Sequence, residues 1–181
     1  MNEVKYEIAK IGTCEQQLQV MKRGCCSSII KGDFYLEGNV FNVTTVVSGF
    51  FHLETFLKNG SLYAERFESS AKLYKDTLGW LRKIVEALLL SEDYLIPSQA
   101  LSIRLEDLYY ESEQGPALLL LKPSQGEFFE KVCKVCDEIF AICPQSNADI
   151  IRKQLQIQNA NALLSLQDLL RLLSSWACEL N

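Results

Sequence analysis

The residues best suited to chemistry are the cysteine pair Cys133 and Cys136 and the only histidine of the chain, His52. Two cysteines at this spacing can hold a metal ion or form a redox couple, but a zinc site normally needs a second pair of ligands. His52 lies far from the pair in the sequence. On a helix, both cysteines share one apolar seam with Phe129 and Phe140, where small thiols pack well. The pattern favours core packing over a metal or redox site.

An acyl-transfer site built on a histidine would have to use His52, since the chain holds no other. No serine or cysteine nucleophile motif lies near it, and it follows the aromatic pair Phe50 and Phe51. Histidine-based catalysis needs a nucleophile within hydrogen-bond reach and a third group that orients the ring. We therefore expect His52 to be a packed residue at the rim of the core.

Two further sets of residues could bind phosphate or a metal ion. Four glycines lie within the first 40 residues: Gly12, Gly24, Gly32 and Gly38. Their spacing matches neither of the common phosphate-binding motifs, and each lies where a turn or helix cap is expected. The carboxylates that could hold magnesium are Glu92, Asp93, Glu106 and Asp107. Acidic residues at helix ends and turns are usually solvated, so we expect no cofactor and no metal site.

The composition excludes several classes of function. The chain has 181 residues, 48% hydrophobic and 23% charged, which fits one folded unit with a sizeable core. Its net charge of −5 argues against nucleic acid, because binding to the phosphate backbone needs clustered lysine and arginine. The longest apolar run, ALLLL at 117–121, is far too short to insert in a membrane. The start, MNEVKYEIAK, lacks the apolar core of a signal peptide. Seven cysteines without an export signal predict reduced thiols and a cytoplasmic location.

The first part of the chain predicts strands and one short helix. Residues 4–11 alternate between apolar and charged side chains, with Val4, Tyr6 and Ile8 on one face, which is typical of a half-buried strand. Residues 14–24 predict a helix that ends at Gly24. The segments SSIIKGDFYLE and VFNVTTVVS flank Gly38-Asn39, a two-residue signal for a hairpin turn. Phe41, Val43 and Val47 would line one face of the second strand.

The remainder predicts mainly helix. Apolar residues recur at steps of three and four on one long helix over about 64–91: Phe67, Ala71, Tyr74, Leu78, Leu81, Val85 and Leu88. LEDLYYES and PALLLLK predict two short strands around EQGP, and three helices follow. The first of these has an apolar seam of Phe129, Val132, Cys136, Ile139 and Cys143 and ends at Pro144. The second begins at Ser146 or Asn147. The third begins with a capping box of Ser165 and Asp168, and it turns Leu166, Leu169, Leu170, Leu173 and Trp176 to one face.

These elements predict one α+β domain over residues 1–181. A small antiparallel, β-rich N-terminal lobe (1–50) precedes a mainly helical C-terminal lobe (51–181) that contains a β-hairpin. No repeat, linker or low-complexity stretch divides the chain.

The order of elements resembles that of a reduced protein kinase, from the middle of its small lobe through the hinge into the catalytic loop. SGFFHLETFL is similar to the hinge and the short helix after it. LGWLRKIVEALLLSEDYLIPSQAL is similar to the long helix that leads into the kinase loop His-Arg-Asp-Leu-Lys-Pro-Glu-Asn. The resemblance implies that residues 91–99 occupy the place of a catalytic loop.

The chemistry of that loop is missing. On the kinase pattern, Tyr94 stands at the catalytic aspartate, Ile96 at the lysine and Gln99 at the metal-binding asparagine. Leu95 and Pro97 keep their character. Leu121, followed by Lys122 and Pro123, stands where Asp-Phe-Gly is expected. Phosphoryl transfer relies on positioning and on neutralising phosphate charge with lysine and magnesium, so the resemblance implies a protein that is not an enzyme.

A closer resemblance covers nearly the whole chain. VSGFFHLETFL, the long helix and LSIRLEDLYYESEQGPALLLLKP are similar to an uncharacterised bacterial domain found N-terminal to forkhead-associated domains in Gram-positive species. That domain is a degenerate, kinase-like (pseudokinase-related) module, and kinase-like pseudoenzymes of type VII secretion machinery show the same kind of loss. An unrelated α+β domain with the same order of elements is the alternative.

Three functions follow from this pattern. The first is a non-catalytic scaffold that binds a protein partner in a bacterial signalling or secretion assembly. The second is a small acidic chaperone or adaptor that dimerises and binds its partner through a hydrophobic helix face. The third is an enzyme or nucleotide binder with an unrecognised site. The sequence identifies neither the partner nor the oligomeric state.

Overall fold

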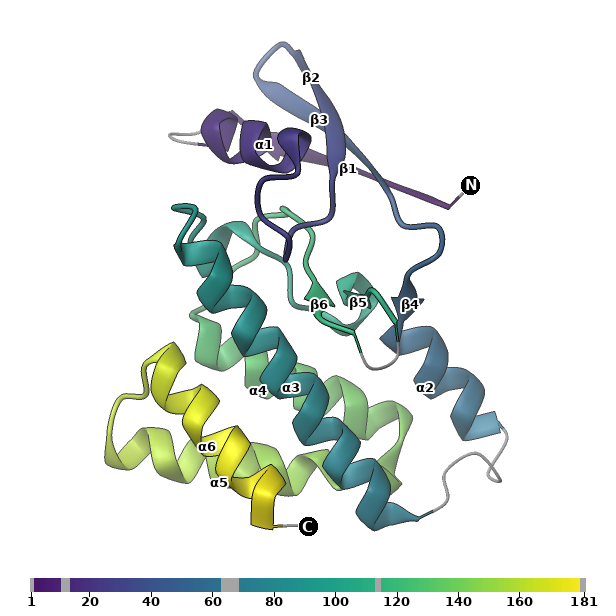
Figure 1. Ribbon diagram of the computed structural model, residues 1–181, viewed down its shortest axis with the longest axis vertical. Helices are drawn as coiled ribbons and strands as arrows, with labels where there is room; N and C mark the ends of the chain where they lie inside the picture. The colour runs from purple at the N-terminus through teal and green to yellow at the C-terminus, as the bar shows by residue number, and fades with distance from the viewer. Residues whose placement is uncertain (1, 11–13, 63–68, 113–114, 180–181) are drawn as a thin grey trace.

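The computed structural model describes residues 2–10, 14–62, 69–112 and 115–179 (Figure 1). A three-stranded sheet and one helix lie at one end of the molecule, and a group of longer helices lies at the other. A second small sheet lies between them. The fold is α+β, as the sequence predicts.

The N-terminal sheet has the order β1-β3-β2 with all pairs antiparallel. Its elements are β1 (Glu3–Ala9), β2 (Gly32–Glu37) and β3 (Val40–Val46), and helix α1 (Cys14–Arg23) lies between β1 and β2 in the chain. The predicted hairpin is confirmed: Glu37 pairs with Val40 across Gly38-Asn39. Of these two turn residues, only Gly38 has a positive φ, +61°. One positive φ at the first central residue is the pattern of a type II′ turn.

The second sheet has the order β4-β5-β6, so it adds β4 to the predicted hairpin, and its strands are shorter than predicted. It consists of β4 (Phe51–His52), β5 (Tyr109–Tyr110) and β6 (Ala117–Leu118). The front of the predicted strand LEDLYYES is instead a 3-10 helix, η3 (Leu105–Asp107). This turn places the Asp107 side chain inside the protein, where it has polar partners. Beyond β6 the chain pairs with two other segments, because Ile30 N–H donates to Leu119 and Ser102 N–H donates to Leu120.

Five helices follow β4: α2 (Leu53–Leu62), α3 (Ser70–Glu92), α4 (Phe128–Ile142), α5 (Ala148–Asn161) and α6 (Leu166–Glu179). The predicted start of α3 near residue 64 is wrong. Ser69 has extended backbone angles, and its side chain accepts a hydrogen bond from the N–H of Lys72 at 3.1 Å, which makes Ser69 the cap. Phe67 lies outside the described residues.

Hydrogen bonds from side chains define the caps at the starts of the last two helices. At α5, Asn147 occupies the cap position, but the side chain that accepts a hydrogen bond is that of Ser146, from the N–H of Ala148. At α6, Ser165 and Asp168 form the predicted capping box, since each side chain accepts from the backbone N–H of the other. The hydrogen bonds from Ser165 lower the pKa of Asp168.

One hydrophobic cluster extends from the N-terminal sheet into the helices. Ile8 and Phe41 belong to it, as do the buried α3 residues Leu78, Leu81 and Leu88. Helix α3 packs against α6 and lies centrally among the helices (Figure 1). A smaller cluster joins the two sheets and consists of Ile30, Val47, Tyr109, Leu118 and Leu120. Within the described part of the chain, no helix combines the length and apolar character needed to cross a bilayer.

Candidate functional site

The candidate site begins where α3 ends, at the loop that the kinase resemblance singles out. The N–H of Ile96 donates to the carbonyl of Ser91 at 3.1 Å, and the N–H of Leu95 donates to the carbonyl of Glu92 at 2.9 Å. These two bonds form a Schellman motif, in which the residue at the position of Leu95 adopts left-handed angles and is usually glycine. Leu95 has a φ of +59°.

Leu95 is also the most exposed side chain of this loop, at 85%. Tyr94, beside it, is 38% exposed, and Leu90, in the last turns of α3, is 36% exposed. A left-handed conformation costs an L-residue with a Cβ about 1–2 kcal/mol. The loop therefore holds an apolar side chain in solvent at a position that glycine would occupy with less strain.

The inner side of the loop is fixed by buried polar contacts. The Ser91 hydroxyl hydrogen-bonds the carbonyls of Leu88 and Ile96, at 2.7 and 3.1 Å. The ammonium of Lys131, a buried residue of α4, donates to the carbonyls of Ser98 and Leu101 at 2.8 and 3.3 Å. Burial lowers the pKa of Lys131, and nearby Glu127 opposes this. Charge-assisted bonds to backbone carbonyls hold the loop in one shape.

The four residues that the kinase resemblance aligns with catalytic groups fall into two environments. Ile96 and Leu121 are buried in the main hydrophobic cluster, at 0% and 2% exposure. Tyr94 and Gln99 lie at the surface, and the Gln99 amide donates to Glu127 at 3.4 Å. The fold therefore does not gather them around one cavity. Within the described residues, no three histidine, cysteine or acidic side chains come together as metal ligands would.

Asp107 differs from the prediction that it is solvated. It is 4% exposed, and its carboxylate accepts a hydrogen bond from the Ser102 hydroxyl at 2.6 Å. The Lys122 ammonium lies 3.0 and 3.2 Å from the two carboxylate oxygens. The hydroxyl of Tyr6 is buried with no hydrogen-bond partner among the described residues, and burial, together with Asp107, raises the pKa of Tyr6. Glu92, Asp93 and Glu106 are exposed, as expected.

Both ring nitrogens of His52 are engaged. Nε2 donates to the carbonyl of Glu106 at 3.1 Å, and Nδ1 lies 2.6 Å from the hydroxyl of Thr55. The ring stacks on Tyr109 with centroids 4.8 Å apart. Because a carbonyl only accepts, Nε2 carries a proton, and the ring bridges β4 to η3 as a structural residue.

Cys133 and Cys136 of α4 and Cys143 directly after it are buried, as predicted. Burial raises the pKa of the Cys133 thiol to about 11 and also raises the pKa of Cys136 and Cys143. Such thiols are poor nucleophiles at neutral pH. The expectation for Phe140 is wrong: its side chain is 37% exposed and lies outside the seam.

Comparisons with protein-family models and with curated proteins give no match to this chain. The fold class and the individual contacts therefore rest on the structure itself. The resemblance to protein kinases and to the forkhead-associated-linked domain stays a prediction.

Three features of this region are not visible in the sequence: the left-handed Leu95, the burial of Asp107 and the position of Lys131 behind the loop. The partners of Asp107 lie 5 and 15 positions away, and Lys131 reaches carbonyls 33 and 30 positions away. Only Ser91, a polar residue at the end of an otherwise apolar helix face, was a usable signal.

Proposed function

We propose that the chain is a non-catalytic, pseudokinase-like module that binds another protein through the docking loop, residues 94–97. The observation that carries the proposal is Leu95, which is strained, 85% exposed and apolar. Strain and exposure both oppose stability. Residues held in such conformations cluster at functional sites, where the surrounding structure fixes them.

The lack of catalysis is supported by the residues that occupy the loop. Tyr94 and Gln99 offer no carboxylate base and no strong ligand for magnesium, which prefers carboxylate and phosphate oxygens. The nearest buried carboxylate, Asp107, is already paired with Lys122 and bonded to Ser102. Both of its carboxylate oxygens are therefore engaged by neighbouring side chains.

Docking is supported by the rigidity of the loop. The Ser91 hydroxyl fixes the carbonyl of Ile96 from the inside, and Lys131 bonds the carbonyl of Ser98 directly after the loop. The side chains of Tyr94 and Leu95 are exposed. A partner that buries Leu95 would not have to order the loop first, and the entropic cost of binding falls when a loop is already in its bound shape. A fully buried leucine side chain contributes about 1.5–3 kcal/mol.

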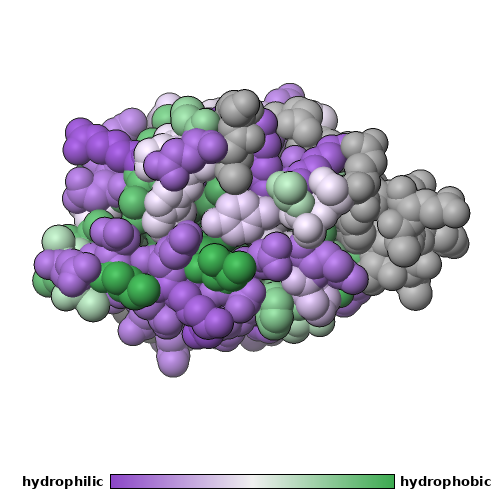
Figure 2. All heavy atoms as spheres, turned by 90° about the horizontal axis from the view of Figure 1, so that it is seen from below, coloured by the Kyte–Doolittle hydropathy of each residue, from purple (hydrophilic) through white to green (hydrophobic). Residues whose placement is uncertain are grey.

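The surface seen in Figure 2 favours the docking loop, and not a broad hydrophobic face, as the site that binds a partner protein. Seen from the helical end, the surface is mainly hydrophilic, with hydrophobic side chains separated from one another (Figure 2). The exposed hydrophobic residues of α4 and α5 are Phe140, Ile150 and Ile157. Scattered apolar side chains of this kind are normal on a protein surface.

The compartment and pathway belong to the same proposal. All seven cysteines are free thiols, which suits a reducing compartment such as the cytoplasm. The resemblance to a forkhead-associated-linked bacterial domain favours a signalling or secretion assembly as the setting.

The test is affinity capture from a lysate of the source organism with the wild type and two variants, Leu95→Ser and Leu163→Ser. Leu163 is the matched control, since it is 92% exposed and has an ordinary negative φ. We expect Leu95→Ser to lose at least one protein that the wild type and Leu163→Ser retain in equal amounts. Identical captured sets for all three proteins would contradict the docking role.

A further inference from the structure

One open cavity differs in charge from the acidic chain that contains it. It has a volume of about 300 Å³, and its lining includes four cations, Arg104, Lys122, Lys131 and Lys134, and no carboxylate. The four come from three segments: the loop before η3, the segment after β6, and α4. The net charge of the whole chain is −5, so this concentration of positive charge is local.

The four cations are not equally neutralised. Lys122 pairs with Asp107 at 3.0 Å, and Arg104 pairs with Glu106 at 2.8 Å on the surface. Lys131 bonds two carbonyl oxygens and no carboxylate. Lys134 makes no hydrogen bond or ion pair with the described residues. The cavity therefore retains positive charge that the surrounding side chains leave unpaired.

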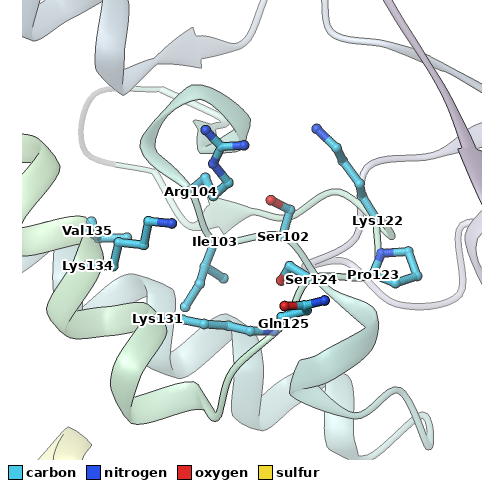
Figure 3. Close-up of a pocket in the computed structure, with 10 residues that line it drawn as sticks. All are labelled: Ser102, Ile103, Arg104, Lys122, Pro123, Ser124, Gln125, Lys131, Lys134 and Val135. Atoms are coloured by element: carbon cyan, nitrogen blue, oxygen red, sulfur yellow. The ribbon is translucent and has the colours of Figure 1, made fainter.

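The close-up shows how these groups lie (Figure 3). Lys134 extends from α4 toward Arg104. The Arg104 guanidinium and the Lys122 amine lie on opposite sides of the Ser102 hydroxyl, and Ser124 and Gln125 lie at the other end of the group. The donor groups of the lining thus lie in several directions and do not form one planar fork.

We propose that this cavity, the anion pocket, binds a small ligand that carries a phosphate group. A phosphate has oxygens in a tetrahedral arrangement, so donors from several directions can contact it at once, whereas a carboxylate is best matched by a planar fork. Lysine binds phosphate as a point charge, which suits Lys134 at the open side. The volume lies at the lower end of ligand pockets, roughly 300–1,000 Å³, and fits phosphate or a small phosphate monoester.

The surrounding residues are consistent with an anion here. Burial lowers the pKa of Lys131, so its charge costs free energy that a nearby anion would partly offset. Asp107 lies behind Lys122 and Ser102, and its negative charge is taken up by the Lys122 ammonium. This proposal is independent of the docking loop, since Lys131 bonds the carbonyls of Ser98 and Leu101, which lie outside residues 94–97.

The test is calorimetric titration with inorganic phosphate and with O-phosphoserine at constant ionic strength, with chloride as the background anion. We expect saturable binding of at least one probe, with a dissociation constant of about 1 mM. Lys134→Gln should weaken the binding of that probe at least about fivefold, since hydrogen bonds to charged groups are stronger than those between neutral groups. Lys10→Gln is the control: Lys10 is exposed in the N-terminal part, and its loss changes the net charge equally.

The two probes distinguish the source of the phosphate group. Tighter binding of O-phosphoserine identifies a phosphorylated small molecule, and tighter binding of inorganic phosphate identifies the free ion. Both results support the anion pocket. The proposal is overturned if neither probe binds above the chloride background, or if Lys134→Gln and Lys10→Gln weaken binding equally.

Discussion

The left-handed conformation of Leu95 predicts that glycine is a more stable replacement than alanine at this position, the reverse of the usual order. At an ordinary position with negative φ, alanine is more stable than glycine by about 0.4–1 kcal/mol, because glycine loses more chain entropy on folding. At a φ of +59° the order should reverse. The left-handed conformation costs alanine about 1–2 kcal/mol, because of its Cβ, and costs glycine nothing comparable. Leu95→Gly should therefore be more stable than Leu95→Ala by about 0.5–1 kcal/mol.

The same terms predict the comparison with the wild type. The Leu95 side chain is 85% exposed, so its removal forfeits only about 0.3 kcal/mol of burial. The relief of backbone strain at residue 95 is slightly larger than the sum of the lost burial and the extra chain entropy that glycine loses on folding. Leu95→Gly should match or exceed the wild type by up to about 1 kcal/mol.

The assay is urea unfolding followed by circular dichroism, with thermal unfolding as a second reading. For a chain of this size, 1 kcal/mol shifts the melting temperature by about 2–4 °C. Leu163 again serves as the control, because its φ is negative, and there alanine should be the more stable replacement. If alanine is more stable than glycine at both positions, Leu95 is not strained and the reasoning fails.

Two further predictions concern the core. Asp107→Ala should lower the free energy of unfolding by about 2 kcal/mol. This is less than the loss expected for a fully buried pair, because the Lys122 side chain is 34% exposed. Asp149→Ala is the control: it breaks an exposed pair with Lys153 and should lower the free energy of unfolding by less than about 1 kcal/mol. In native protein a thiol reagent should modify the exposed Cys25 and Cys178 but reach Cys136 only after unfolding, and Cys136→Ala should cost about 1 kcal/mol. Stoichiometric zinc by elemental analysis would contradict the prediction that the buried cysteines bind no metal, and a much larger loss in Cys136→Ala would contradict a simple packing role.

Features that depend on neighbours in the sequence were predicted well. The hairpin at Gly38, the end of α1 at Gly24 and the capping box of α6 each depend on residues within a few positions of one another. The apolar spacing also identified the buried faces of α4 and α6 and, from Leu78 to Leu88, that of α3, whereas Ala71 of the predicted stripe is exposed. Such features are local, so the pattern of residue types contains most of the information.

Features that depend on distant contacts were missed. Nothing marks residue 95 as left-handed, because the glycine or asparagine that usually signals this conformation is absent. Asp107 resembles any acidic turn residue until the fold brings Ser102 and Lys122 to it. The anion pocket is likewise invisible in the sequence, since its four cations lie in three separate segments of an acidic chain.

The central claim, that the loop at residues 91–99 performs no phosphoryl transfer, is tested most directly by calorimetry with ATP and magnesium. The wild type should show no magnesium-dependent ATP binding tighter than about 1 mM, which corresponds to roughly −4.1 kcal/mol. Asp93 is exposed and directly precedes Tyr94, the residue that the kinase resemblance aligns with a catalytic aspartate, so Asp93→Ala is the informative variant. Sub-millimolar binding that requires magnesium and disappears in Asp93→Ala would contradict the account and identify residues 91–99 as a working nucleotide site.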